Sequence, residues 1–352
     1  MSKRLTISLD AMGGDNSPNM VIAGANTALK ELPDVRYLLF GNEQQIKPIL
    51  ERFPRVKESS RVCHTDDVVL NETPPAIALR SGRNSSMRLA INAVANGEAD
   101  GIVSAGNTGA LMAMAKFVLK TLPGIDRPAI AACLPTQRGE TVMLDLGANV
   151  LCNANHLVQF AVMGEVFARN VLAHEQPSIG LLNIGVEGVK GNESVKKAAL
   201  ILQESTPPIH FYGFVEGDDI GAGTVDVIVT DGFTGNVALK TIEGTAKMYT
   251  YYLKQALLDS WAARFGALLA RPALTKLRAH LDPRRYNGAM LLGLNGICVK
   301  SHGGTDAFGF ANAIRTAVQL VTEGVNEDIK KEYAKIGETL VQEQQQKAVA
   351  NG

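Results

Sequence analysis

Residues 5–41 decide the fold class of this chain, and they read LTISLDAMGGDNSPNMVIAGANTALKELPDVRYLLFG. An apolar run of strand length, Leu5 to Asp10, ends at an acidic residue and is followed by a helical pattern from Pro18 to Glu31. A second apolar run, Val35 to Gly41, then ends in a glycine. Near-continuous hydrophobicity is typical of strands that helices cover on both faces. The stretch therefore predicts a strand, a helix and a second strand in an α/β protein.

The same alternation continues along the chain. Further strands are predicted at Gly101 to Ala105, Thr141 to Gly147, Ile179 to Gly185, Ile209 to Val215 and Val225 to Asp231. Helices are predicted at Thr108 to Lys120, Ala154 to Ala173 and Asn192 to Gln203. Such alternation favours a mostly parallel sheet flanked by helices. We expect one α/β domain over residues 1–341, a helical excursion at about 241–287 that lacks strands, and a polar tail at 342–352.

The composition is that of an ordinary globular protein. Of 352 residues, 46% are hydrophobic and 20% charged, which excludes a disordered chain or a coiled coil. The 35 basic and 35 acidic residues cancel, so no overall field attracts nucleic acid, and we expect no nucleic-acid partner. Four cysteines without a CxxC pair, no signal-peptide core and no long uncharged apolar run predict a cytoplasmic protein with reduced thiols.

Glycine-rich loops follow several of the predicted strands. In a parallel sheet, ligands gather where strands end and helices begin, because helix N-termini there present free N–H groups. The first such loop frames two glycines with two acids and has four candidate substrate-binding residues, Asp10, Gly13, Gly14 and Asp15. The alternative interpretation is a tight turn between a strand and a helix.

The second loop is Ser104-Ala-Gly-Asn-Thr-Gly109, directly before a predicted helix. Small residues with hydroxyl and amide donors at a helix start suit an anion the size of phosphate. No Lys-Ser/Thr pair follows, so this is not a Walker A loop. The candidates are Ser104, Gly106, Asn107, Thr108 and Gly109, although helix capping alone would explain Asn107 or Thr108.

Three later loops and one histidine complete the candidate site. Lys190, between glycines, and Asn236, in a first helical turn, are candidate catalytic residues together with Asp231. A lysine in such a loop is often merely solvated. The further candidate substrate-binding residues are Asp145, Asn149, Asn183, Glu187, Lys240 and His302.

The predicted excursion is basic and amphipathic. Residues 247–285 hold eight Lys or Arg residues against two Asp, an excess of six positive charges in an otherwise neutral chain. Leucines, Trp261 and Phe265 recur there at helical spacing. Three interpretations remain open: a helix pair that forms a dimer, a docking surface for an acidic protein, and a segment that rests on lipid.

Five ordered motifs together resemble the PlsX family of bacterial phosphate acyltransferases. They are SLDAMGGDN, SAGNTGA, LDLGAN, NIG-x-E-x-x-KG and TDGFTGN, and the resemblance runs from about Arg4 to about Val341. It implies a three-layer α/β/α sandwich similar to that of phosphotransacetylases and isocitrate dehydrogenases. It also implies a homodimer that moves a long-chain acyl group from acyl carrier protein to inorganic phosphate, without metal or cofactor. The acyl phosphate would pass to a membrane glycerol-3-phosphate acyltransferase, with peripheral contact at the inner face of the cell membrane.

The chemistry that the resemblance implies needs no protein nucleophile, because hydrogen phosphate can itself attack a thioester near pH 7. We expect phosphate in the loop from Ser104 to Gly109, with Lys190 and Asn236 polarising the carbonyl or orienting phosphate. Two other functions stay open. One is a phosphotransacetylase for short acyl-coenzyme A, and the other is a noncatalytic scaffold that recruits lipid-synthesis enzymes to a membrane.

Overall fold

One continuous sheet forms the centre of the molecule. The structure, a computed structural model, describes residues 4–205 and 209–335. The eleven strands of the sheet lie in the order β3-β2-β1-β4-β11-β10-β5-β6-β9-β7-β8. Their bounds are β1 (Thr6–Asp10), β2 (Arg36–Gly41), β3 (Ser60–His64), β4 (Gly101–Ser104), β5 (Ala129–Thr136), β6 (Gly139–Leu144), β7 (Ile179–Leu182), β8 (Phe211–Val215), β9 (Val227–Val229), β10 (Ala289–Leu292) and β11 (Ile297–Lys300).

Helices connect most of these strands. Their bounds are α1 (Asn19–Ala28), α2 (Glu43–Leu50), α3 (Pro54–Ser59), α4 (Pro75–Ser81), α5 (Ser86–Ala95), α6 (Thr108–Leu119), α7 (Ala154–Val171), α8 (Glu193–Gln203), α9 (Asp219–Ala222), α10 (Gly232–Leu258), α11 (Trp261–Leu269), α12 (Arg271–His280), the 3-10 helix η1 (Pro283–Tyr286) and α13 (Ala307–Thr322). All strands and helices predicted from the sequence are present, with ends shifted by a few residues. The strands β3, β5, β10 and β11 were not among the predicted strands.

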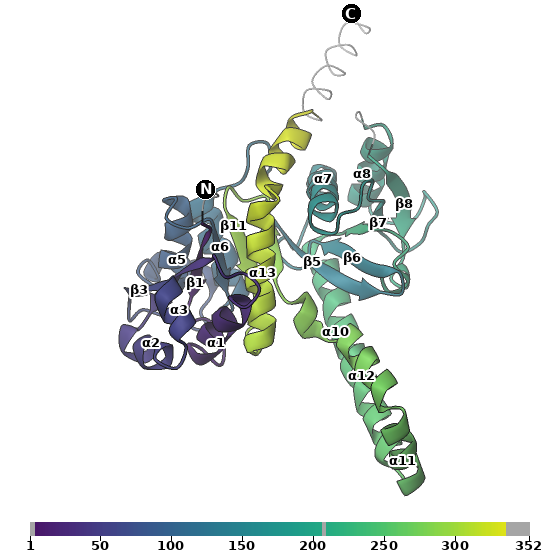
Figure 1. The fold of residues 1–352 in the computed structure, drawn as a ribbon. Coiled ribbons are helices and arrows are strands. Elements are labelled where there is room, and N and C mark those ends of the chain that lie inside the picture. The colour runs from purple at the N-terminus through teal and green to yellow at the C-terminus, as the bar shows by residue number, and fades with distance from the viewer. Residues whose placement is uncertain (1–3, 206–208, 336–352) are drawn as a thin grey trace, which may run out of the picture.

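Two hydrophobic layers cover the two faces of the sheet. One layer joins α1, α7, α8 and α13 through large buried side chains such as Phe160, Phe167 and Phe310. The other joins α4, α5 and α6, and the residues Ala238 and Leu239 of α10 pack against it. Figure 1 shows α13 running along the middle of the molecule. The predicted α/β/α sandwich is therefore confirmed, because each face of the sheet buries one helical layer.

The sheet contains two parallel halves that run in opposite directions. The strands β3, β2, β1, β4 and β11 are mutually parallel, and so are β6, β9, β7 and β8. Three antiparallel pairings separate them: β11 with β10, β10 with β5, and β5 with β6. An odd number of reversals inverts the direction, so the strands of the two halves end at opposite edges of the sheet.

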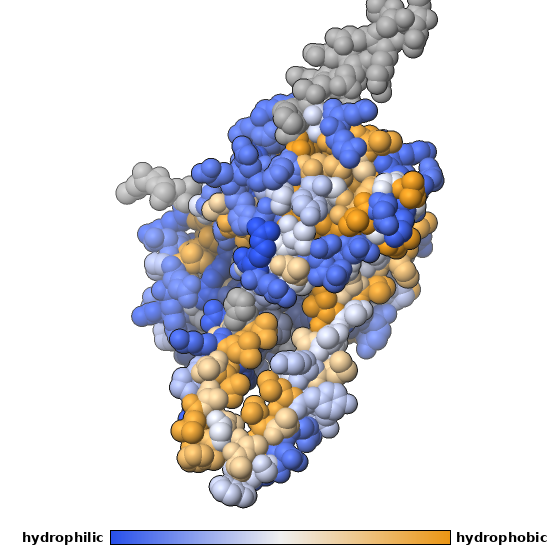
Figure 2. Space-filling model, turned by 90° about the vertical axis from the view of Figure 1, so that its right-hand side faces the viewer, coloured by the Kyte–Doolittle hydropathy of each residue, from blue (hydrophilic) through white to orange (hydrophobic). Residues whose placement is uncertain are grey.

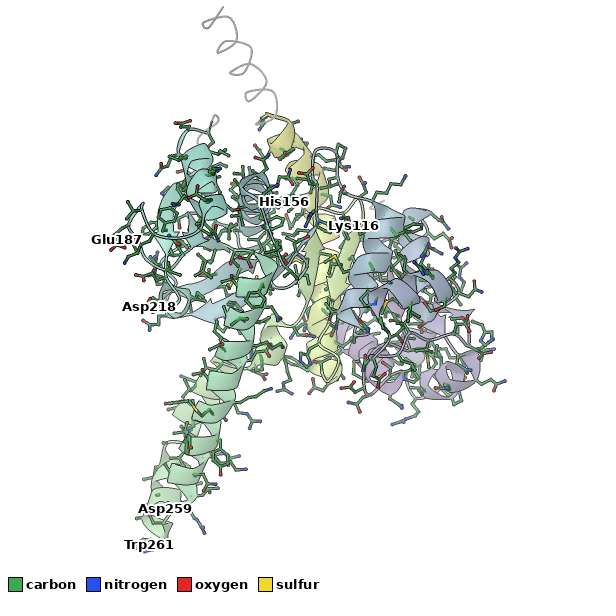
Figure 3. All side chains as sticks on the ribbon, turned by 180° about the vertical axis from the view of Figure 1, so that it is seen from behind. Lys116, His156, Glu187, Asp218, Asp259 and Trp261 are labelled. Atoms are coloured by element: carbon green, nitrogen blue, oxygen red, sulfur yellow. The ribbon has the colours of Figure 1, made fainter. Side chains whose placement is uncertain are left out.

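A helical arm, made of α10, α11 and α12, projects from the sheet (Figure 1). Residues 241–287, where the sequence predicts an excursion, are mainly helical, and the first of these helices begins earlier, at Gly232. Figure 3 shows Asp259 and Trp261 at the far tip of the arm. Within the described ranges, no helix has the length and apolar character needed to cross a membrane. A helical segment at 325–335 follows α13, and the predicted polar tail lies outside the described residues.

Candidate functional site

A buried carboxyl group joins the ends of β1 and β4. Asp10 is 1% exposed and accepts hydrogen bonds from the hydroxyl groups of Ser86 (2.6 Å) and Ser104 (2.7 Å). Ser104 in turn accepts a bond from the N–H of Gly106 at 3.1 Å. Burial raises the pKa of Asp10, and the two hydroxyl donors partly oppose this rise. Asp10 therefore fixes the start of the predicted phosphate loop rather than facing solvent.

Glycines let the loops after β1, β4 and β11 touch one another. A Cβ at Gly13 would lie 2.4 Å from Oδ2 of Asp10 and 2.7 Å from the nitrogen of Gly106. Gly14 has φ +102°, and a Cβ there would lie 3.0 Å from Cβ of Ala105. The N–H of Asp15 donates to the carbonyl of Gly303 at 3.0 Å. Side chains would separate these backbones, so the glycines are needed for the close approach.

The N-terminus of α6 forms the wall of this predicted phosphate loop. Asn107 caps the helix by accepting from the N–H of Ala110 at 3.0 Å, and its amide donates to carbonyls in the segment 70–73. Its side chain is therefore occupied by structural bonds. Thr108 is exposed, and a Cβ at Gly109 would lie 2.7 Å from Pro75. The N–H groups of a helix's first turn have no partner within the helix, so this end can accept an anion.

A lysine that was not among the sequence candidates lies beside the same loop. Lys300, at the end of β11, pairs in register with Ser104 and is only 8% exposed. Its Nζ donates to the carbonyl of Ala105 at 3.4 Å and to that of Ser301. Burial lowers the pKa of Lys300 to about 8, although Asp10 and Asp15 favour its charged form. A lysine at the end of a short apolar run was the signal that could have found it.

Two further candidates lie close to Lys300. The ammonium of Lys240, on α10, lowers the pKa of Lys300 by repulsion, and it also forms an ion pair with Glu243 at 2.8 Å. His302 is exposed, and its backbone N–H donates to Oδ1 of Asn287 at 2.9 Å. Its Nδ1 accepts from the N–H of Gly304 at 3.1 Å. We call Asp10, Asp15, Ser104, Gly106 and Lys300 the β4 cluster.

A second buried carboxyl group organises the loop after β6. Asp145 is fully buried and accepts five hydrogen bonds of 2.7 to 3.1 Å. The donors are the backbone N–H groups of Ile130, Gly147, Ala148 and Asn149 and the side-chain amide of Asn149. Burial raises the pKa of this carboxyl, and these donors partly offset the rise. Asp145 and Asn149 thus hold the shape of the loop.

The start of α10 packs onto that loop. A Cβ at Gly235 would lie 1.9 Å from the carbonyl oxygen of Asp145, so only glycine fits there. Asp231 caps α10 by accepting from the N–H and the hydroxyl of Thr234 at 2.8 and 2.9 Å. The exposed Asn236 lies over Gly147, whose added Cβ would be 3.6 Å from that of Asn236. We call Asp145, Asn149, Asp231 and Asn236 the β6 cluster.

The loop after β7 carries the third group of candidates. Lys190 and Glu187 are exposed and form an ion pair at 2.9 Å, which raises the pKa of the lysine and lowers that of the glutamate. The amide of Asn183 donates to the carbonyls of Gly185 and Lys190 at 3.0 and 3.2 Å, which closes the loop on itself. Figure 3 shows Glu187 at the outer side of the molecule.

The candidates are thus not gathered at one edge of a parallel sheet, as the sequence alternation suggested. The β4 cluster follows strands of one half, while the β6 cluster and the β7 loop follow strands of the other half, which point the opposite way. The helix α10 links the halves. It begins in the β6 cluster and packs on the face that carries α6, which brings Lys240 near Lys300.

The described part of the chain offers no constellation for a metal. Among residues 4–205 and 209–335, no group of three or more His, Cys, Asp or Glu side chains could hold an ion. What the site offers is a helix N-terminus, close-packed glycine loops, buried carboxyl groups and lysines. Such a set can bind and orient an anion and stabilise negative charge.

The fold is similar to that of solved phosphotransacetylases. A phosphotransacetylase from Streptococcus pyogenes superposes with a TM-score of 0.62 at 18% identity, over 92% of this chain and 95% of that chain. A branched-chain phosphotransacylase from Enterococcus faecalis gives 0.57 at 15% identity, over 90% and 99% of the two chains. At these identities the similarity concerns the fold alone.

The sequence comparisons are more specific. The profile of the family described as "Fatty acid synthesis protein" matches residues 5–328, and the chain belongs to this family, which confirms the resemblance to PlsX. A relative from Paramagnetospirillum magneticum, named "Phosphate acyltransferase", is 62% identical over 96% of both chains. A relative of the same name from Rhodospirillum centenum is 61% identical over 97% of this chain and 96% of its own length.

Proposed function

We propose that this chain transfers a long-chain acyl group from acyl carrier protein to inorganic phosphate, for use in phospholipid synthesis. The observation that carries the proposal is the β4 cluster. There the first turn of α6 and a buried lysine meet at a loop whose glycines let the neighbouring backbones pack closely. The name shared by the similar relatives, "Phosphate acyltransferase", supports the transfer of an acyl group to phosphate.

The proposed reaction has one displacement. An oxygen of hydrogen phosphate attacks the thioester carbonyl carbon, a tetrahedral oxyanion forms, and the C–S bond breaks. The products are an acyl phosphate and the carrier thiol, which takes up the proton that phosphate releases. Because phosphate is the nucleophile, the protein's tasks are to hold it about 3 Å from the carbonyl carbon and to stabilise the developing charge.

In this proposal the site residues divide into four roles. Phosphate lies in the loop from Ser104 to Gly109, at the first turn of α6. Lys190 and Asn236 polarise the carbonyl or orient phosphate. The carboxyl groups of both clusters, with Asn149 and Asn183, hold the loops in place, and Gly13, Gly14, Glu187, Lys240 and His302 line the space for the substrate.

A direct assay tests the reaction. The purified chain, given palmitoyl-carrier and orthophosphate, is expected to form acyl phosphate and free carrier thiol in equal amounts. Release of no acyl phosphate, or the trapping of an acylated protein intermediate, would overturn the proposal. A faster reaction with acetyl-coenzyme A than with palmitoyl-carrier would favour a phosphotransacetylase for short acyl groups, the second candidate that the shared fold supports.

The partners belong to the same proposal. The arm exposes basic side chains together with large apolar ones, among them Tyr252, Trp261, Phe265 and Leu269 (Figure 2). We propose that its basic residues meet the acidic surface of acyl carrier protein and that its tip contacts membrane lipid. The chain itself is proposed to form a homodimer, and its product is proposed to pass to a membrane glycerol-3-phosphate acyltransferase.

A further inference from the structure

Lys300 is the one basic residue of the β4 cluster, and it is the last residue of strand β11. Side chains alternate along a strand, and Cys298, two residues earlier, packs in the same hydrophobic layer as α6. Lys300 therefore points to the face on which α6 and the start of α10 lie. A buried ammonium is costly unless an anion or several acceptors compensate its charge.

The protein itself compensates only part of this charge. An ammonium group has three N–H bonds. Within the described residues, the carbonyls of Ala105 and Ser301 are the acceptors that the structure records, and neither carries a formal charge. Ala105 belongs to the proposed phosphate loop, Ser104 to Gly109. No acceptor among the described residues is recorded for the third N–H bond, so this bond can donate to a bound anion.

The titratable groups that act on the Lys300 ammonium come from β1 and the loop after it, from α10, and from β11 itself. Asp10, at the end of β1, and Asp15, in the loop after it, attract the ammonium, and Lys240 from α10 repels it. Cys298 lies on the same strand, and burial raises the pKa of its thiol to about 12, so it stays neutral up to pH 10. An anion that binds beside a buried ammonium and a helix N-terminus is stabilised by both.

We propose that Lys300 binds the phosphate dianion at the start of α6 and sets the affinity of the enzyme for phosphate. This inference rests on the proposed function and adds a residue to it. It assigns to Lys300 a role in phosphate binding and none in recognition of the acyl carrier. Loss of the ammonium charge is therefore expected to weaken phosphate binding selectively.

The first test compares Lys300→Met with the wild-type protein. The KM for phosphate is expected to rise at least tenfold, while the KM for palmitoyl-carrier stays within twofold. Lys57→Met, which removes an exposed lysine on α3, is the matched control and is expected to change neither constant. Calorimetric titration with inorganic phosphate, without acyl donor, is expected to show the same weakening in Lys300→Met.

The second test begins with the wild-type protein, whose pH profile does not depend on the folding of a variant. With a lysine pKa of about 8, the phosphate KM is expected to rise about tenfold between pH 7.5 and pH 9, because the ammonium loses its proton. Phosphate remains mainly a dianion over this range. In Lys300→Met the same plot is expected to be flat.

The outcomes separate the two proposals. If the wild-type protein forms acyl phosphate but Lys300→Met keeps its phosphate KM, its phosphate affinity and the pH profile, the role of Lys300 is refuted and the function stands. If the wild-type protein forms no acyl phosphate, the function is refuted, and the calorimetric titration still decides whether Lys300 binds phosphate.

Discussion

Asp145 shows how one buried carboxylate can hold a whole loop. Both of its oxygens accept only N–H donors, from Ile130 on the neighbouring strand to Asn149 at the far end of the loop. An amide in its place would turn an NH₂ group toward donors that need an acceptor. Hydrogen bonds to charged groups contribute about 1.5 to 3 kcal/mol each, and a buried group left unpaired costs a similar amount.

Asp145→Asn is therefore expected to lower the free energy of unfolding by about 3 kcal/mol, because the backbone donors lose a charged acceptor. Urea denaturation followed by circular dichroism measures the change. The matched control is Asp34→Asn, on an exposed loop, which we expect to change the free energy of unfolding by less than about 0.5 kcal/mol. A variant at Asp145 as stable as this control would show that the bonds are not needed.

The proposed roles of Lys190 and Asn236 predict that their loss lowers turnover. If they stabilise the oxyanion or orient phosphate, Lys190→Ala and Asn236→Ala should each lower kcat by roughly 10² to 10³. Initial rates of acyl phosphate formation measure this, with Lys196→Ala as control, since Lys196 lies on α8 and pairs with Glu193. Turnover near the wild-type value in both variants would remove them from the catalytic machinery.

At the level of single residues, the sequence predicted which loops carry the candidate residues but not what every residue in them does. Glycines and polar residues after apolar runs pointed to Asp10, Ser104 and Asp145. The sequence could not show that the amide of Asn107 donates to carbonyls of the segment 70–73, because these hydrogen bonds join residues far apart in the chain. The sequence did not indicate Lys300 as a site residue, because its burial depends on the helices that pack over β11.

At the level of elements, hydrophobic pattern predicted strands well and their directions poorly. The runs Leu5 to Asp10 and Thr141 to Gly147 look alike in the sequence, yet the two strands run in opposite directions. The cause is the antiparallel insertion of β10 and β5 between the halves. Strand β10 follows the helical arm in the chain and lies more than 140 residues after β5. Such long-range pairing leaves no local signal.

The basic residues of the arm predict that binding of acyl carrier protein depends on salt. Exposed cations attract an acidic partner less as ionic strength rises, because salt screens charges over about 10 Å at 0.1 M. The KM for acyl carrier protein should therefore rise with salt, while kcat changes little. Replacing three exposed arm lysines by glutamine, at Lys247, Lys254 and Lys276, should raise that KM at low salt and flatten its salt dependence.

The matched control for the arm removes the same charge elsewhere. Lys30, Lys47 and Lys57 are exposed residues of the opposite half of the sheet, and their replacement by glutamine should leave the salt dependence as in the wild-type protein. Equal effects in the two triple variants would indicate that net charge, and not the arm, governs the encounter. A KM that is constant between low and high salt would exclude electrostatic docking.

At the level of the whole molecule, the charges balance but their distribution does not. The 35 positive and 35 negative charges sum to zero, while residues 247–285 retain an excess of six positive charges. The same segment carries Trp261, which is 83% exposed, and Leu269, which is 69% exposed. Monomeric proteins rarely leave contiguous apolar residues in water, so this end of the molecule is where a partner is expected.

The last prediction concerns what covers this tip. If it is lipid, the wild-type chain should float with vesicles that contain anionic phospholipid, and Trp261→Ser with Phe265→Ser should reduce binding at least tenfold, because each aromatic ring loses about 2 kcal/mol of transfer free energy. Leu200→Ser with Tyr212→Ser, exposed apolar residues on α8 and β8, is the control and should float like the wild-type chain. Sedimentation without lipid tests the alternative that a second copy of the chain covers the tip. If both double variants are dimers, lipid contact is supported. If only the arm variant is a monomer, the tip contacts a second copy of the chain.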